Sequence, residues 1–404
     1  MTSPQYRGSV FGGTLLVAGS CIGAGMLALP ILTGLAGFTP SLLLFLICWL
    51  FMMTTGLLLL EVNIWLGGKV GLVTMAGRTL GKRGKVVTWL TFLFLFYCLN
   101  VAYIDAGGRL VADFFSSLTG NHLPLWGGEL VVVLFFGAVV YLGTAVVDGI
   151  NRILVIGLAA AYFSLIALGT PHLSSHYLAY HNWHFALAGI PIIITSFGFH
   201  NMIPSLAQYL HAEKRRLIAV VAIGSIIPLV IYIVWELLIL GIVPPEGPLF
   251  ATAASEGLSA TELLRTISKN GWVTTVAEYF AFFAITTSFL TQSLSFVGFL
   301  ADGTKIKRKG MGHVFLCLLA LAPGFIFTLS YPNLFLTALG FAGGFGAMIL
   351  FGIIPALMVW KKRKAENDKK SRIVPGGPLL LIAVVVFAAF VFLLQLGYLL
   401  GWLQ

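Results

Sequence analysis

Residues 19–25 of the chain read GSCIGAG, and residues 195–201 read TSFGFHN, with Pro191 before the second stretch and Pro204 after it. Each stretch falls near the middle of a long apolar run. Glycine has a poor helix propensity and proline removes a backbone hydrogen-bond donor, so both stretches are predicted to interrupt a helix. Paired interruptions at corresponding positions of two halves of a membrane protein indicate a solute-binding site.

The composition places these interruptions in a membrane. Of the 404 residues, 59% are hydrophobic and 9% are charged, whereas soluble domains carry about 25% charged residues. We predict an all-α integral membrane protein, because runs of about 20 apolar residues suit a bilayer. Eleven spans are expected, at residues 9–35, 41–66, 86–118, 130–144, 152–170, 186–206, 217–243, 272–301, 313–329, 334–359 and 378–403.

The lysine and arginine residues orient these spans. With the N-terminus in the cytoplasm, all but three of the 24 basic residues fall in cytoplasmic segments, as the positive-inside rule requires. The exceptions are Arg109 within the third span and Arg265 and Lys269 in an outer loop. We therefore predict a cytoplasmic N-terminus and a C-terminus on the outer side. The net charge of +10 reflects this topology, and nucleic acid is not an expected partner.

Five spans precede the interrupted sixth span, which predicts an inverted repeat. Its halves are residues 1–171 and 186–360, and residues 378–404 form an additional span. The first span would run outward and the sixth inward. Unwound backbone is tolerated in a bilayer only where it is buried or lines a cavity. The N-terminal ends of half-helices can hold a carboxylate and freed carbonyls can hold an ammonium, and an amino acid carries both groups.

Each glycine stretch also has a plainer interpretation, because Gly19 and Gly23 have the spacing of a helix-packing motif. The matched pair of stretches favours a binding site. A helix rises about 1.5 Å per residue, which places parts of the third and eighth spans at the depth of the breaks. The predicted substrate contacts are Ser20, Gly23, Ala24, Gly25, Tyr103, Ser196, Phe197, Phe199, His200, Asn201, Thr287 and Ser288.

Ionisable residues inside spans are costly to bury and are functional candidates by default. Asp105 and Arg109 are four residues apart with the acid first, a spacing that favours a helical ion pair or a gate. Glu236 and Glu278 have no partner within their own helices, and a buried unpaired carboxylate can carry a proton. Glu61 comes late in its span, so it is either a third proton-coupling candidate or a wetted interfacial carboxylate.

His200 is the fourth candidate for proton coupling, because it lies beside the sixth-span break and histidine titrates near physiological pH. A lone histidine in an apolar span is more often a satisfied hydrogen-bonding residue. The sequence does not decide whether His200, Glu236 or Glu278 carries the proton.

Other site types have little support. Four histidines cluster in one outer loop, but no cysteine or carboxylate accompanies them, so no metal is predicted. No nucleotide-binding motif or catalytic constellation is present, so no cofactor and no enzyme activity are expected. A channel would show a repeated filter element or rings of charge. A channel and an integral-membrane enzyme remain the alternatives from other functional classes.

The chain resembles the bacterial aromatic amino acid permeases. The most specific motifs are GSCIGAGMLALP at residues 19–30 and TSFGFH at residues 195–200. Further similar stretches follow in order along nearly the whole chain, at LLLLEV (57–62), Gly143-Thr144, Asp148, Asn151-Arg152, Pro204-Ser205, 287–290, Tyr331-Pro332 and 338–340.

The resemblance implies a leucine-transporter-like core and proton-coupled import through the inner membrane of a bacterium. It also implies that residues 23–25 and 196–200 contact the substrate. L-tyrosine is the first expected substrate and L-tryptophan the second. The tyrosine-specific members are expected to differ at the Asp105 and Arg109 pair and at Glu236, which leaves the coupling route open. Sodium coupling, or a serine/threonine permease of the same fold, is the alternative.

Overall fold

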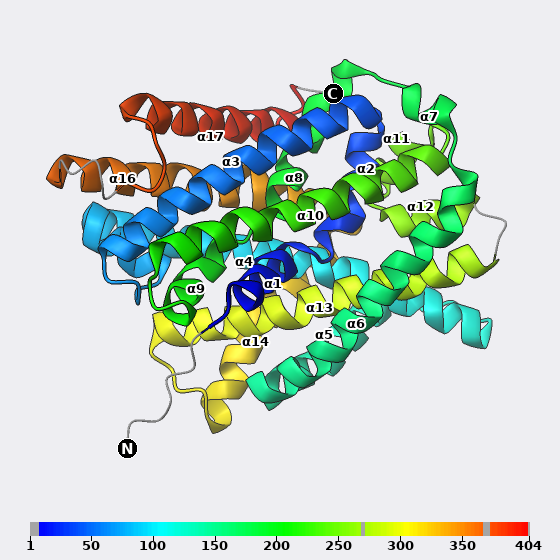
Figure 1. Ribbon diagram of the computed structural model, residues 1–404. Helices are drawn as coiled ribbons and strands as arrows, with labels where there is room; N and C mark the ends of the chain where they lie inside the picture. The colour runs from blue at the N-terminus through cyan, green and yellow to red at the C-terminus, as the bar shows by residue number, and fades with distance from the viewer. Residues whose placement is uncertain (1–7, 268–270, 367–371, 403–404) are drawn as a thin grey trace.

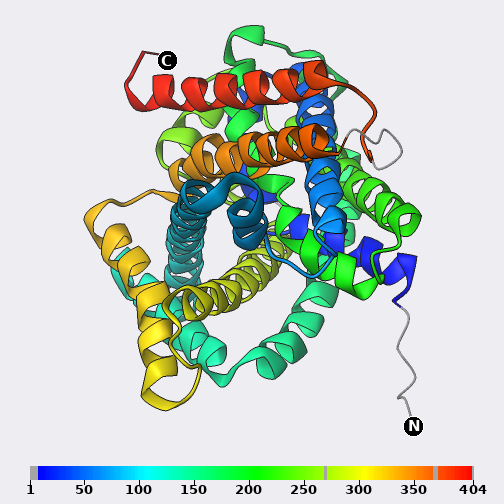
Figure 2. The same cartoon turned by 90° about the vertical axis from the view of Figure 1, so that its left-hand side faces the viewer.

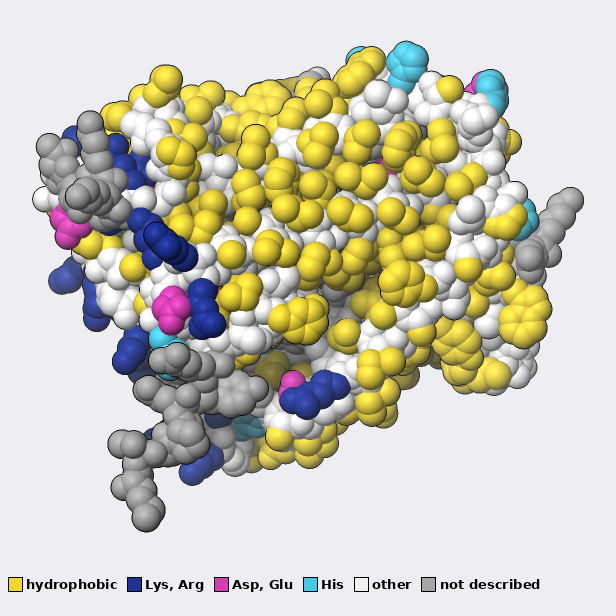
Figure 3. Space-filling view, viewed as in Figure 1, with side chains coloured by type: hydrophobic (Ala, Val, Ile, Leu, Met, Phe, Trp, Pro, Cys, Tyr) yellow, Lys and Arg dark blue, Asp and Glu magenta, His cyan; other side chains and the backbone are white. Residues whose placement is uncertain are grey.

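Every predicted apolar run forms a helix in the structure, a computed structural model that describes residues 8–267, 271–366 and 372–402. Within these described residues, ten helices are long and apolar enough to cross a membrane, and the bent pair α1 (Val10–Cys21) and α2 (Gly25–Gly34) makes the eleventh span. The predicted eleven spans are therefore confirmed. Many large hydrophobic side chains of the bundle (Figure 1) are exposed, and they cover most of the face shown in Figure 3, as expected of a lipid-facing surface.

The first five spans occupy the first half of the chain. After the bent pair they are α3 (Phe38–Trp65), α4 (Leu72–Thr119), α5 (Leu125–Leu142) and α6 (Thr144–Gly169). A connection with η1 (Thr170–His172), α7 (Ser175–Ala179) and η2 (Trp183–Gly189) leads to the second half.

The second half repeats the pattern of one broken span followed by four others. The broken span comprises α8 (Ile190–Ser196), η3 (His200–Met202) and α9 (Ile203–Tyr209). It is followed by α10 (Lys214–Ile242), α13 (Gly271–Thr304), α14 (Gly310–Ser330) and a composite span of α15 (Phe335–Phe341), the π-helix η4 (Ala342–Ile353) and α16 (Ile354–Ala365). Two short helices, α11 (Leu249–Ser255) and α12 (Ala260–Ile267), lie between α10 and α13, and α17 (Pro378–Leu399) ends the chain.

Several predicted boundaries differ from the structure, and α6 begins at Thr144 rather than at 152. α4 begins at Leu72 rather than at 86 and kinks at Gly81, whose φ of 80° interrupts the helix. Lysine and arginine have good helix propensities, so the helix continues beyond the apolar run. α5 begins at Leu125 rather than at 130, which brings Glu129 into the helix. The π-helix was not expected, and a hydropathy pattern cannot distinguish it from an α-helix.

The two halves pack on each other reciprocally. α1 of the first half packs on α10 of the second, and α9 of the second packs on α3 of the first. In the same way α6 packs on α13, and α4 packs on α15 and η4. Each of these contacts thus has a counterpart between the spans five places away along the chain. Such paired contacts are expected of two repeats that pack on each other. α17 lies outside both halves, against η4 and α16 (Figure 2).

Charge is distributed unevenly between the two ends of the bundle. On the face shown in Figure 3, the lysine and arginine side chains gather at the end where α3 finishes and α4 begins, here called the basic end. The short helices α7, α11 and α12 lie at the opposite end (Figure 1). The separation matches the predicted loops, and the assignment of the basic end to the cytoplasm stays a prediction.

Candidate functional site

The first span breaks within the GSCIGAG stretch. α1 ends at Cys21 and α2 begins at Gly25, with a bend of 55° between them. The Ile22 amide donates to the Ala18 carbonyl at 3.0 Å to close α1, and the Met26 amide donates to the Gly23 carbonyl at 3.1 Å to open the next turn. The amide end of α2 therefore lies in the middle of the span, where its dipole favours an anionic group.

The sixth span breaks within the TSFGFHN stretch. The Phe197 amide donates to the Ile193 carbonyl at 3.2 Å to close α8, and a single 3₁₀ turn then leads into α9. Pro204 is the second residue of α9, a position where the missing N–H costs no helical hydrogen bond. The interruptions predicted from glycine and proline thus lie in the middle of both spans.

Tyr232 of α10 joins the two breaks. Its hydroxyl is shared between the carbonyl oxygen of Cys21 at 2.6 Å and that of Ser196 at 2.9 Å, near the ends of α1 and α8. The breaks also touch directly, since a Cβ added at Gly25 would lie 2.9 Å from the Ser196 Oγ. The two interruptions therefore form one site.

A cavity of about 600 Å³ opens between these breaks, α4 and α13. We call it the central cavity. Its lining runs from Gly25, Tyr103 and Ser196 in mid-bundle to Asp302 and Arg308, which follow the predicted span of α13 toward the basic end. Small-molecule sites span about 300–1,000 Å³, so the central cavity has room for an amino acid with an aromatic side chain.

Nine of the twelve predicted substrate contacts line the central cavity, and three do not. The nine are Ser20, Gly23, Ala24, Gly25, Tyr103, Ser196, Asn201, Thr287 and Ser288. Phe197 turns away and packs edge-on against Tyr232, with ring centroids 5.2 Å apart. Phe199 is fully buried and packs beside Gly56 of α3.

His200 lies behind the cavity wall. Its ring stacks on Phe351, which lines the cavity, with centroids 4.5 Å apart, and its Nε2 lies 3.0 Å from the Thr55 Oγ1. The backbone after the break turns within one 3₁₀ turn, and this direction cannot be derived from spacing along the chain. Substrate contact by Phe197, Phe199 and His200 stays a prediction.

A family model settles what kind of protein contains this site. The model describes the tryptophan/tyrosine permease family and matches residues 6–395. The chain belongs to the tryptophan/tyrosine permease family. Its relatives are transport proteins and not enzymes, and this permease is a multi-pass membrane protein for amino acid transport.

Two bacterial relatives cover nearly all of the chain. A tryptophan-specific transport protein of Haemophilus influenzae is 31% identical, over 98% of this chain and 98% of that protein. The tyrosine-specific transport system 1 of the same organism is 32% identical, over 96% of this chain and 98% of that protein. The predicted resemblance is therefore confirmed. The identities to the tryptophan-specific and the tyrosine-specific relative are almost equal.

A solved structure shows the same fold. The crystal structure of MhsT in complex with L-phenylalanine matches with a TM-score of 0.64 at 16% identity, and covers 96% of this chain and 98% of that chain. This likeness confirms the leucine-transporter-like arrangement of five plus five spans with an additional span.

Asp105 and Arg109 of the permease lie beyond the central cavity, on the side away from the basic end of the bundle. Arg109 Nη2 is 3.3 Å from Asp105 Oδ2, and the same nitrogen donates to Asn333 Oδ1 at 2.7 Å. The Phe335 amide donates to Asp105 Oδ2 at 3.2 Å. The pair thus connects the third span to the start of the tenth, as a gate would.

Glu61 of the permease is buried rather than wetted. Its carboxylate lies 3.3 Å from Lys362 Nζ and 2.9 Å from Arg363 Nη2, and it accepts the Ile373 amide at 2.8 Å. The interfacial interpretation failed because the C-terminal part of α16 and the segment after it cover Glu61, and hydropathy does not reveal such long-range contacts. The arrangement indicates an ionised carboxylate that connects α3 to α16.

We expect Glu61→Gln to lower the stability of the permease. Removing one partner of a buried ion pair costs about 3–5 kcal/mol, because the other charge stays buried without compensation. Asp148→Asn is the matched control, since Asp148 pairs with Arg152 on an exposed helix surface and such pairs contribute about 0–1 kcal/mol. Thermal unfolding of both variants in detergent tests this expectation, and equal melting temperatures would contradict it.

The other two carboxylate candidates differ in their surroundings. Glu236 is 1% exposed and hydrogen-bonds the Thr33 hydroxyl of α2. Glu278 is half exposed and pairs with Arg265 of α12 at 3.4 Å. Glu278 is therefore paired. Its partner comes from another segment of the chain and was not visible within its own helix. Proton coupling by either residue stays a prediction.

Glu129 and Tyr232 are buried side chains that were not predicted from the sequence as site residues. Glu129 of α5 is 1% exposed and accepts a hydrogen bond from Thr328 at 3.0 Å, but the predicted span began one residue after it. Tyr232 stands in an apolar run whose Pro228 lies inside an unbroken helix, so no predicted interruption marked this position. The depth estimate could have found Tyr232, because it lies near the middle of its span.

Tyr232→Phe should weaken substrate binding by about tenfold, because two buried carbonyls lose their donor at the joined breaks, and an unmade buried hydrogen bond costs about 1–3 kcal/mol. The measurement is the KM for tyrosine uptake in proteoliposomes. Tyr162→Phe is a matched control, since its hydroxyl also donates to a backbone carbonyl, that of Ile231 at 2.9 Å, away from the cavity. An equal rise in KM for both variants would contradict a specific role for Tyr232.

Proposed function

We propose that this permease imports aromatic amino acids, L-tyrosine first and L-tryptophan second, by proton symport through the central cavity. The observation that carries the proposal is the meeting of two broken helices at one cavity. The relatives named for tyrosine and for tryptophan transport support the substrate class.

The two ends of the substrate find complementary groups at the breaks. The amide end of α2, at residues 23–25, suits the carboxylate, and the carbonyl end of α8 at Ser196 suits the ammonium. The aromatic ring would extend toward Phe96, Leu99 and Phe351, which line the same cavity. These apolar walls favour an aromatic side chain over that of serine or threonine.

Glu236 is the favoured proton carrier. No lysine or arginine of the described segments forms an ion pair with it. Its hydrogen-bond partner, the Thr33 hydroxyl, also lies 2.6 Å from the Leu29 carbonyl. A hydroxyl has one proton. When Thr33 donates to Leu29, only a protonated Glu236 can complete the second bond.

A direct protein contact favours protons over sodium. The Ala24 amide of the first-span break donates to the Ser288 Oγ of α13 at 2.8 Å. A sodium ion between these segments would need oxygen ligands, and an amide N–H directed at the same hydroxyl repels a cation. Sodium coupling remains the alternative for the test below.

Access to the site would alternate between the two sides of the bilayer. The cavity extends to Asp302 and Arg308 at the basic end, while the Asp105 and Arg109 pair connects two spans on the other side. With the N-terminus cytoplasmic and the C-terminus outside, this is an inward-facing state. Rocking of the repeat halves, residues 1–171 and 186–360, with 378–404 at their side, would reverse it.

The test is uptake of labelled tyrosine and tryptophan into proteoliposomes, with a proton gradient or a sodium gradient imposed separately. Uptake should follow the proton gradient, and each unlabelled amino acid should compete with the other. Uptake driven by sodium alone would overturn the coupling. Uptake of serine or threonine in preference to both aromatic amino acids would overturn the substrate class.

A further inference from the structure

A second cavity lies between α4, α5 and α13, apart from the central one. Its volume is about 370 Å³, within the range of small-ligand sites. The linings of the two cavities have no residue in common in the described segments. The proposed transport route therefore does not explain this cavity.

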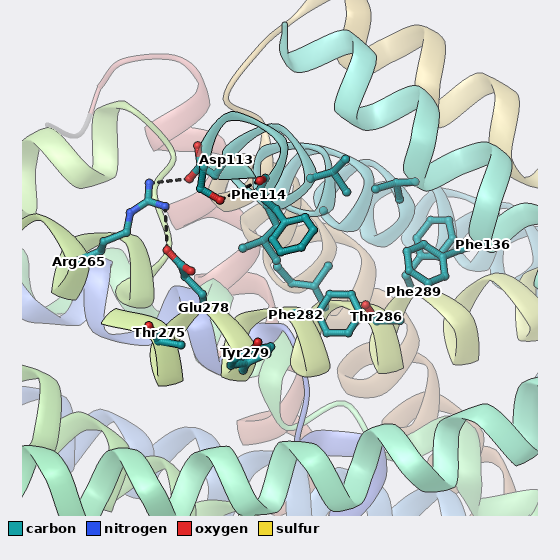
Figure 4. A pocket seen from close by; sticks show the side chains of 16 residues that line it. Asp113, Phe114, Phe136, Arg265, Thr275, Glu278, Tyr279, Phe282, Thr286 and Phe289 are labelled. Carbon is teal, nitrogen blue, oxygen red and sulfur yellow. Dashed lines mark hydrogen bonds and ion pairs between the residues drawn. The ribbon is translucent and has the colours of Figure 1, made fainter. Parts of the chain in front are cut away.

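Three charged side chains form one end of the second cavity. Arg265 of α12 lies 2.5 Å from Asp113 of α4 and 3.4 Å from Glu278 of α13 (Figure 4). Two carboxylates face one guanidinium, so these three described side chains have a net charge of −1. The Asp113 and Glu278 side chains are 39% and 49% exposed, so both remain accessible. Such a cluster attracts one further positive charge.

Aromatic rings contribute much of the remaining lining, together with aliphatic and small side chains. Phe114 and Phe282 lie nearest the charged end, and Phe136 and Phe289 lie farther along (Figure 4). Tyr279 lines the cavity one residue after Glu278. Aromatic faces attract organic ammonium ions and also provide apolar contact, so carboxylates beside aromatic rings match one particular ligand chemistry.

We propose that the second cavity binds an organic ammonium ion with an aromatic body, the chemistry of a free aromatic monoamine. The ammonium lies against the exposed parts of the Asp113 and Glu278 carboxylates, beside Arg265, and the ring lies among the phenylalanines. An amino acid is disfavoured, because its carboxylate would face the same two acids. A phospholipid amine shares the headgroup chemistry, but a volume of 370 Å³ suits a small free molecule better than a lipid.

The second cavity adjoins the helices that carry the central site. Gly107, one turn after Tyr103 on α4, lines it, as does Thr286, the neighbour of Thr287 on α13. A ligand held between α4 and α13 opposes their relative movement. If the proposed transport function holds, tryptamine should lower the maximal rate of uptake without raising the KM for tyrosine.

The direct test is equilibrium binding of labelled tryptamine to the full-length permease in phosphatidylcholine nanodiscs. Saturable binding that persists with excess tyrosine is expected. Asp113→Asn should weaken it by about tenfold, because the compensating charge is removed, and Phe282→Ala should weaken it through loss of an aromatic face. Asp148→Asn, which removes an exposed paired carboxylate elsewhere, should leave it unchanged.

Three results would overturn the proposal. Binding that is unaffected by both cavity variants would place tryptamine elsewhere. Binding abolished by excess tyrosine would place it in the central cavity. Binding lost when phosphatidylethanolamine replaces phosphatidylcholine would assign the site to a lipid headgroup. None of these results depends on uptake, so failure here is distinguishable from failure of the proposed transport function.

Discussion

Gly25→Leu should reduce tyrosine uptake by about a hundredfold while the protein still inserts and folds. Gly25 begins α2 at the contact between the two breaks, and a Cβ there would already lie 2.9 Å from the Ser196 Oγ. Overpacking of a tight contact costs about 1–3 kcal/mol, and the larger value corresponds to roughly a hundredfold. Uptake into proteoliposomes at matched protein content measures the loss.

The control for this variant is Gly149→Leu. Gly149 lies on an exposed surface of α6, and no atom lies within 4 Å of a Cβ built there. The same change of residue should therefore leave uptake near the wild-type rate. Normal uptake by a well-expressed Gly25→Leu variant would contradict the assignment of the central cavity as the transport site.

Glu236→Gln should abolish accumulation but preserve exchange. Glutamine keeps a hydrogen bond to Thr33 but cannot bind and release a proton. A proton gradient of one pH unit is worth about 1.4 kcal/mol per proton, which supports roughly tenfold accumulation at one proton per amino acid. The variant should therefore reach an inside-to-outside ratio near unity, while counterflow of labelled against unlabelled tyrosine continues.

The two assays together separate coupling from folding. A variant that loses both accumulation and counterflow has lost binding or structure, whereas retained accumulation would remove Glu236 as the proton carrier. Glu246→Gln, in the exposed loop after α10, is the control for a change from carboxylate to amide and should behave as the wild-type protein does in both assays.

The positions of both breaks could be predicted because their causes are local. Glycine and proline weaken a helix through their own backbone, whatever surrounds them. The glycines around Gly23 and Gly198 and the prolines at Pro191 and Pro204 therefore mark the breaks. The nine predicted residues that line the central cavity follow from those positions and from equal depth along the spans. The direction of a side chain after a break is different, because one 3₁₀ turn decided that His200 lies behind Phe351.

Partners from distant segments could not be predicted from spacing. Glu61 is paired with Arg363, and Glu278 with Arg265, across gaps in the chain that no helical periodicity connects. The Asp105 and Arg109 pair was visible because it lies within one helix. The further contact of Arg109 with Asn333, which connects the third span to the start of the tenth, was not visible from spacing.

The sequence by itself therefore determined the membrane environment, the number of spans, the two interruptions and the family, because hydropathy, helix propensity and motifs act over a few neighbouring residues. Only the tertiary structure decided which carboxylates are compensated, which aromatic rings face the central cavity, and that Tyr232 joins the two breaks. The physical reason is that burial and pairing arise between helices, where each contact depends on the packing of the whole bundle.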